Sequence, residues 1–141
     1  MPTTVAIVIT STDQPCLLDT DVLIDYLRGH ASARDLFAQL PDDCAISTVS
    51  VAELHAGVRD GPERKALSTL LSTFELIELS AAIAIQGGLL RRDWGKAHGM
   101  GLNDALIAAT ALTCKRVLLS LNAKHFPMLG ARQLVVPYLK H

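Results

Sequence analysis

The chain has 141 residues, half of them apolar, and a formal net charge of −1. That length and composition predict one packed globular domain and exclude a disordered or low-complexity chain. The near-neutral charge argues against a protein that coats nucleic acid with a broad basic face, but not against an enzyme that contacts nucleic acid at one site. No apolar run approaches the ~20 residues that cross a bilayer. Residues 1–14 do not resemble a secretory signal. We therefore expect a cytoplasmic protein with no membrane partner.

The chain alternates short apolar strands with helical segments. Residues 1–14 are predicted to be an N-terminal extension or an edge strand, and residues 15–141 a single domain. Strands are predicted at 16–18, 44–47, 74–79, 117–119 and 133–136. Helices are predicted at 21–28, 31–40, 48–58, 62–72, 80–96 and 104–114, the last capped by Asn103, with a short helical turn from residue 123. This alternation predicts an α/β fold whose parallel sheet is covered by helices on both faces, with ligands at the carboxyl ends of the strands.

The three cysteines, Cys16, Cys44 and Cys114, are an odd number without a short metal-type spacing. Two lie in apolar strand-like runs and one lies late in an apolar helix. We expect small buried hydrophobes in a reduced compartment rather than a disulfide framework or a zinc site.

Two acidic residues begin the candidate site. Asp19 ends the first predicted strand, although an aspartate there also suits a helix start. Glu53 shares a helix face with Val49, Ala52 and Ala56, so its carboxylate is predicted to point toward the interior. A surface glutamate at the edge of that stripe is the alternative.

Two further residues join them. Asp104 heads an otherwise apolar stripe that includes Ile107 and Ala111, and an ordinary acid in the first helical turn is the alternative. Asn122 follows the strand at 117–119, two residues after Ser120, and either residue could cap the next helical turn. Asn122 is the weakest member of the set.

All four positions fall just after a strand or in the helix that leaves it, and a parallel sheet brings such positions to one edge. Carboxylates gathered there would repel one another, and a hard divalent cation relieves that repulsion. We therefore predict a Mg²⁺ or Mn²⁺ site held by Asp19, Asp104 and Glu53, for metal-assisted phosphoryl chemistry. The histidines and cysteines do not form a zinc-type set.

The predicted substrate contacts are weaker. Thr20 and Ser120 flank the acids, and the basic side chains Arg91, Arg92 and Lys124 could bind flanking phosphates. A solvated charged surface explains each basic cluster equally well.

The blocks CLLDTDVLIDYLRG, ISTVSVAELHAGV, NDALIAATAL and LLSLNAKHF, between residues 16 and 136, resemble the four motifs of the PIN domain. Their order and spacing resemble the VapC toxins of bacterial toxin–antitoxin pairs in particular. The resemblance implies a five-stranded parallel sheet between helices and places the family's core acids on Asp19, Glu53 and Asp104. Its fourth position, usually Asp and sometimes Asn, falls on Asn122, which puts a second metal in doubt, and Ser120 stands where the family often has Thr.

The same resemblance implies a metal-dependent endoribonuclease that acts on RNA, forms a homodimer and is held inactive by a cognate VapB-like antitoxin. Three alternatives remain: a nuclease acting on DNA, a partner-binding module whose site has decayed, and a phospho-accepting receiver domain. The last fits poorly because the strand at residues 74–79 is not followed by an acceptor aspartate.

Overall fold

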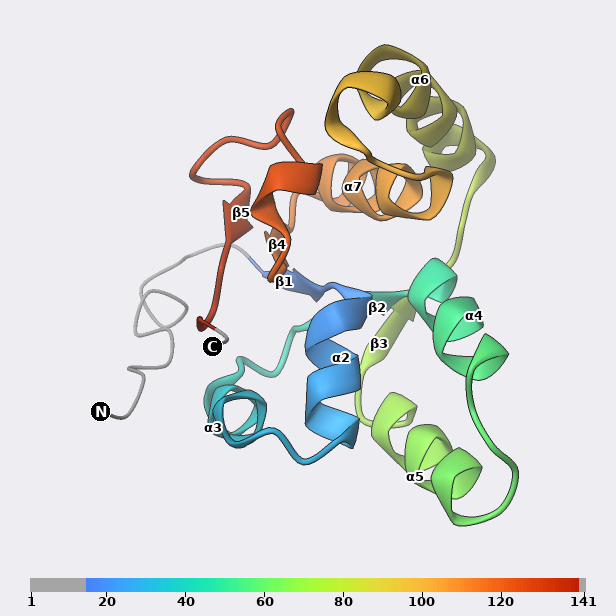
Figure 1. Ribbon diagram of the computed structural model, residues 1–141, viewed down its shortest axis with the longest axis vertical. Coiled ribbons are helices and arrows are strands. Elements are labelled where there is room, and N and C mark those ends of the chain that lie inside the picture. Colours follow the sequence, from blue (N-terminus) through green and yellow to red (C-terminus); the bar gives the residue numbers. More distant parts are fainter. Residues whose placement is uncertain (1–14, 140–141) are drawn as a thin grey trace.

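A computed structural model describes residues 15–139 of the chain (Figure 1). Short strands alternate with helices along the whole of this range. The elements are β1 (Cys16–Leu18), α2 (Thr20–Leu27), α3 (Ala31–Gln39), β2 (Ala45–Ser47), α4 (Thr48–Ala56), α5 (Pro62–Leu71), β3 (Glu75–Ile77), α6 (Ala81–His98), α7 (Leu102–Cys114), β4 (Val117–Leu119), the 3₁₀ turn η1 (Ala123–His125) and β5 (Leu134–Val135). The predicted extension or edge strand in residues 1–14 lies outside the described residues.

The five strands form one sheet in the order β3-β2-β1-β4-β5, and every neighbouring pair is parallel. From β1 the chain adds β2 and β3 on one side, then returns to the other side of β1 with β4 and β5. The direction of strand addition therefore reverses between β1 and β4. Ligands of open α/β sheets bind outside the carboxyl ends of the strands at such a reversal.

Alternate residues of the strands feed two separate apolar cores. Leu17 and Leu118 pack with Ile107 of α7 on one face, whereas Leu18 and Leu119 belong to the core on the other face. Figure 1 shows α6 and α7 on one side of the sheet and α2, α3 and α5 on the other. The predicted α/β fold, a five-stranded parallel sheet covered on both faces, is confirmed.

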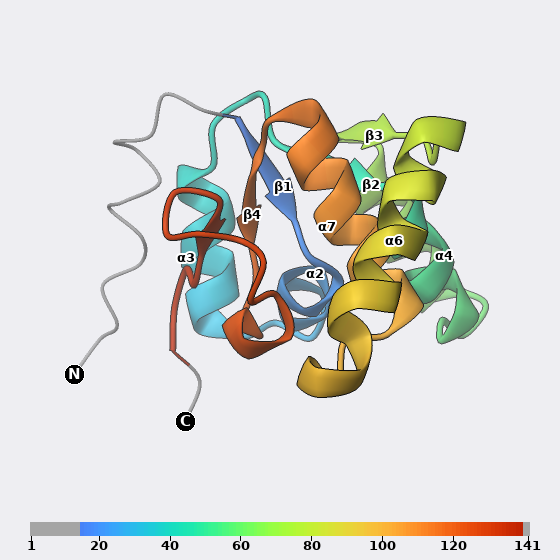
Figure 2. The ribbon, with the colours of Figure 1, turned by 90° about the horizontal axis from the view of Figure 1, so that it is seen from above.

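Helix α6 packs mainly on α7 (Figure 2). The two helices approach closely at Gly87, where an added Cβ would lie 2.6 Å from Leu106 Cδ2. No helix within residues 15–139 is long and apolar enough to cross a membrane.

The prediction for two of the cysteines is wrong. Cys16 and Cys44 form a disulfide across the start of β1 and β2, with their Cα atoms 4.9 Å apart. The parallel pairing of Leu17 with Ala45 makes the preceding cysteines direct neighbours on the same face, which is disulfide geometry. Cys114, in contrast, is free, as expected, but it is half-buried rather than fully buried.

The start of α7 also differs from its prediction. Gly101 occupies the N-cap and the helix begins at Leu102, so Asn103 lies inside the first turn and does not cap the helix. This shift directs the Asn103 side chain across to α4, with consequences for the site.

Candidate active site

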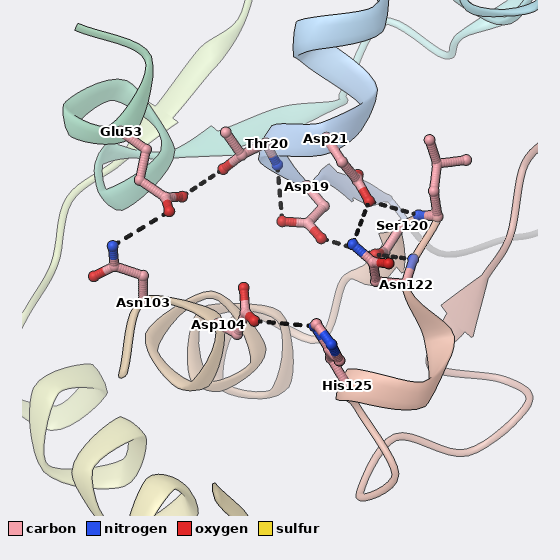
Figure 3. A network of polar contacts seen from close by, with 10 residues as sticks. Asp19, Thr20, Asp21, Glu53, Asn103, Asp104, Ser120, Asn122 and His125 are labelled. Atoms are coloured by element: carbon pink, nitrogen blue, oxygen red, sulfur yellow. Dashed lines mark hydrogen bonds and ion pairs between the residues drawn. The ribbon is translucent and has the colours of Figure 1, made fainter. Parts of the chain in front are cut away.

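Asp19 lies at the carboxyl end of β1 and is the N-cap of α2. Its side chain is 5 % exposed. The Thr20 backbone N–H donates to Asp19 Oδ1 (2.8 Å), and the Ser120 hydroxyl donates to Oδ2 (2.7 Å) (Figure 3). Because Ser120 directly follows β4, this contact joins the two strands between which the sheet order reverses. The structure thus places Asp19 at the expected edge.

Asp21, in the first turn of α2, faces the loop that follows β4. Its Oδ2 accepts from the Leu121 backbone N–H (3.0 Å) and from Asn122 Nδ2 (3.3 Å). Its Oδ1 is buried without a hydrogen-bond partner. Asn122 therefore contacts Asp21 rather than Asp19 or Asp104, and its backbone N–H donates to Ser120 Oγ (3.1 Å). The first turn of α2 and the β4–η1 loop are held together by this network.

Glu53 of α4 is half-buried and held from two sides. Thr20 Oγ1 donates to its Oε1 (2.6 Å), and Asn103 Nδ2 of α7 donates to its Oε2 (3.2 Å). Thr20 is also hydrogen bonded to the buried Ser50 (2.8 Å). The carboxylate is thus oriented by residues from α2 and α7 (Figure 3).

The reason given for Glu53 from the sequence is wrong, although the residue does reach the site. Within the supposed core-facing stripe, Val49 is buried but Ala52 and Ala56 are exposed, and α4 also buries Ser50 and Leu54, which lie outside the stripe. The stripe lines a surface groove of about 610 Å³ between α4 and the start of α7, with Glu53 on its wall.

Asp104 lies in the first turn of α7, and the buried Ile107 continues its face toward the sheet, as predicted. Its Oδ2 lies 3.4 Å from His125 Nδ1 of η1, and both side chains are about one-third exposed. The carboxylate therefore sits at the top of an apolar helix face and faces η1.

The basic residues that were predicted to bind phosphates lie apart from this network. The Arg92 guanidinium pairs with Asp93 on exposed α6 (2.8 Å), and the Arg91 side chain lies over Gly95 of the same helix. Lys124 is exposed on η1, next to His125. Of the three, Lys124 directly precedes His125, which contacts Asp104.

Burial and mutual repulsion oppose ionisation of the acids. Burial, followed by repulsion from Asp21, raises the pKa of Asp19 to about 7. Burial raises the pKa of Asp21 to about 6, although two backbone N–H donors oppose the shift. Burial and repulsion from Glu53 raise the pKa of Asp104, while His125 lowers it. A cation placed among these groups would favour their ionised forms.

These residues fit a hard divalent cation. Among the described residues, no lysine or arginine forms an ion pair with the carboxylates of the site, which are those of Asp19, Asp21, Glu53 and Asp104. Asp21 Oδ1 is also buried without a hydrogen-bond partner. Within residues 15–139, no three acidic, histidine or cysteine side chains already form a metal-binding group. Binding through one or two carboxylates with water completing the shell, which is typical of Mg²⁺, is consistent with that arrangement.

Sequence reasoning missed the positions of three polar side chains. Asp21 was treated as part of a helix start and Asn103 as a cap, and His125, in the predicted helical turn from residue 123, was considered only as a weak candidate for a substrate contact. The Gly101 N-cap is the signal that would have placed Asn103 inside the helix. The position of His125 depends on the conformation of the β4–η1 loop, for which the sequence holds no comparable signal.

Comparison with known proteins identifies the fold and the family. Residues 16–127 match the family model described as PIN domain. The chain belongs to the PIN domain family. This PIN domain protein is 43 % identical over 115 residues to Ribonuclease VapC10 of Mycobacterium tuberculosis, covering 79 % of the chain and 86 % of that protein. It is 39 % identical over 116 residues to Ribonuclease VapC19 of the same organism, covering 79 % and 92 %.

A solved structure agrees with both matches. The PIN domain superposes on a chain of a toxin–antitoxin complex from Klebsiella pneumoniae with a TM-score of 0.76 and 31 % sequence identity. The match covers 89 % of the present chain and 99 % of the other. The PIN resemblance of the four motif blocks is therefore confirmed.

Proposed function

We propose that this PIN domain protein is a divalent-metal-dependent endoribonuclease and the toxin of a VapBC-type pair. The main support is that the carboxylates of Asp19, Glu53 and Asp104 lie together at the carboxyl ends of the strands, where the strand order of the sheet reverses. Relatives at 39–43 % identity bear the name ribonuclease, which supports RNA as the substrate.

Asp19 and Asp104 would hold Mg²⁺ or Mn²⁺, with Glu53 supporting the site. Their oxygen-only donors suit both ions. When bound, the cation makes water a better nucleophile and neutralises charge that develops on the phosphate.

The protein residues supply orientation and proton transfer. Thr20 and Asn103 fix the Glu53 carboxylate, which would accept a proton from the attacking water. The Ser120 hydroxyl and the Thr20 N–H hold Asp19 in one orientation. Asn122 acts through Asp21, by tying the β4–η1 loop to α2. In-line attack by water leaves a 5′-phosphate and a 3′-hydroxyl.

Substrate phosphates would contact the surface around the acids. Lys124 is exposed beside the site and would bind a flanking phosphate. Arg91 and Arg92 would act further along the RNA, from α6. Because Arg92 already pairs with Asp93, we expect its contribution to be smaller than that of Lys124.

The partners follow from the same proposal. The matched Klebsiella structure is a toxin–antitoxin complex, which supports a VapB-like antitoxin for this chain. A groove of about 980 Å³ between α2, α3 and α5, lined by Tyr26, Phe37 and Phe74, offers an apolar surface for such a partner. Exposed Ile85 and Leu89 on the outer face of α6 support a homodimer. Because the proposed substrate is cellular RNA, we propose that the protein acts in the cytoplasm.

The test is incubation of the purified, antitoxin-free protein with total RNA and Mg²⁺ or Mn²⁺, in parallel with single- and double-stranded DNA. We expect RNA cleavage that EDTA abolishes and that Asp104→Asn abolishes while the circular dichroism spectrum is unchanged. Asp35→Asn, which removes an exposed carboxylate of α3, is the matched control and should cleave normally. Cleavage of DNA alone would support the DNA nuclease instead, and no cleavage of either would support a decayed, partner-binding module.

A further inference from the structure

His125 is presented to Asp104 by the hydrogen-bonded turn η1. Its backbone N–H donates to the Asn122 carbonyl (2.9 Å), and the Phe126 N–H donates to the Ala123 carbonyl (3.0 Å). The next side chain, Phe126, is 1 % exposed and anchors the turn in the core. The imidazole consequently points from η1 toward Asp104 of α7, although about one-third of the side chain stays exposed (Figure 3).

The contact with Asp104 is of the kind that two ligands of one cation make. His125 Nδ1 lies 3.4 Å from Asp104 Oδ2. Adjacent ligands around an octahedral cation at about 2.1 Å lie roughly 3 Å apart. As an ion pair alone, two side chains this exposed would stabilise the fold very little.

We propose that His125 contributes its Nδ1 atom as a ligand of the divalent cation, beside Asp104, and that the site consequently favours Mn²⁺ over Mg²⁺. The proposal deepens the proposed function and rests on its metal site. Mg²⁺ takes oxygen ligands, whereas Mn²⁺ accepts carboxylates and, as a first-row transition metal, binds imidazole nitrogen more readily. One imidazole in an otherwise oxygen donor set therefore shifts selectivity toward Mn²⁺.

The competing interpretation is that His125 is only a charge partner of Asp104. A protonated imidazole would then compete with the cation for that carboxylate. Its removal would leave the affinities for both ions unchanged or would raise both together. A weaker affinity for Mn²⁺ after removal of His125 is thus expected only if His125 is a ligand.

The experiment compares the full-length metal-stripped protein with its His125→Asn variant. Mn²⁺ binding is measured by the electron paramagnetic resonance signal of the free ion, and Mg²⁺ binding by competition. We expect His125→Asn to weaken Mn²⁺ binding by about tenfold or more, the scale on which even residues around a metal site affect affinity. Mg²⁺ binding should change little, and the ¹⁴N coupling of an imidazole in the pulsed spectrum of bound Mn²⁺ should disappear.

Control variants distinguish this proposal from the alternative explanations. His98→Asn, at the exposed end of α6, should leave Mn²⁺ affinity and the nitrogen coupling unchanged. Asp104→Asn should weaken the binding of both Mn²⁺ and Mg²⁺. Equal or stronger Mn²⁺ binding by His125→Asn, or wild-type Mn²⁺ without nitrogen coupling, would overturn the proposal. Mn²⁺ bound through His125 in a protein that cleaves no RNA would overturn the ribonuclease proposal and leave this one standing.

Discussion

Replacing Asp19 by Asn should stabilise the metal-free protein while abolishing cleavage. The Asp19 carboxylate is 5 % exposed and faces Asp21, and together these effects raise its pKa from 3.8 to about 7. The folded protein consequently binds more protons than the unfolded chain between those two values. Its free energy of unfolding must therefore fall as the pH rises through that window.

The expected size follows from the shift. Each pKa unit corresponds to about 1.4 kcal/mol, so ionising Asp19 in the folded state costs at most about 4 kcal/mol. Asparagine avoids this cost. Its Oδ1 can still accept from the Thr20 N–H, and its Nδ2 can donate to Ser120 Oγ, which reverses the direction of that hydrogen bond. It loses a favourable charge at the start of α2, worth about 0.3–1 kcal/mol. We expect Asp19→Asn to be more stable than wild type by about 2–3 kcal/mol at about pH 8, and by much less at about pH 5.

Urea denaturation in EDTA, followed by circular dichroism, measures this difference. Added Mn²⁺ at about pH 8 should stabilise wild type more than the variant. Asp35→Asn, which removes an exposed carboxylate of α3, is the matched control and should change neither stability nor its pH dependence. A lower free energy of unfolding for Asp19→Asn than for wild type at about pH 8 would refute the assigned burial cost.

Three further outcomes are expected. Thr20→Val removes the hydroxyl that orients Glu53 (2.6 Å). It should lower kcat by about tenfold with a smaller change in KM, since one hydrogen bond to a charged group is worth about 1.5–3 kcal/mol. An unchanged kcat in steady-state RNA cleavage would contradict this role. Reducing the Cys16–Cys44 disulfide, which closes a 28-residue separation, should lower the free energy of unfolding by about 3–4 kcal/mol in urea denaturation. Identical unfolding curves with and without dithiothreitol would exclude this stabilisation by the disulfide. Gly87→Ala places a Cβ 3.1 Å from the α7 backbone and should lower the free energy of unfolding by about 1–3 kcal/mol in thermal denaturation. Gly88→Ala, with open space around it, should raise it by about 0.5–1 kcal/mol. A destabilised Gly88→Ala together with a Gly87→Ala as stable as wild type would contradict the assigned packing of α6 on α7.

The sequence predicted the architecture because each strand and helix carries its own apolar pattern. Asp19 and Asp104 could be placed at one edge of the sheet for a related reason, since strand ends and helix starts are visible locally. The reason given for placing Glu53 beside them was wrong. Its helix buries the face with Leu54, and the position owes its place in the site to the contacts with Thr20 and Asn103.

The features that sequence reasoning missed depend on contacts between distant segments. The Cys16–Cys44 disulfide requires β1 and β2 to be neighbours in a particular register, which neither strand specifies alone. The contact between His125 and Asp104 requires the path of the η1 turn. Both follow from the assembled sheet rather than from local pattern.

The chemistry of the cleaved ends tests the central claim most directly. Water activated at the carboxylate site and attacking in line should leave a 5′-phosphate and a 3′-hydroxyl on every RNA product, in the presence of Mg²⁺ or Mn²⁺ and not of EDTA. Ligation-based mapping of the fragments reads both ends. Products with a 2′,3′-cyclic phosphate, formed equally well in EDTA, would contradict a metal-dependent site built from Asp19, Glu53 and Asp104.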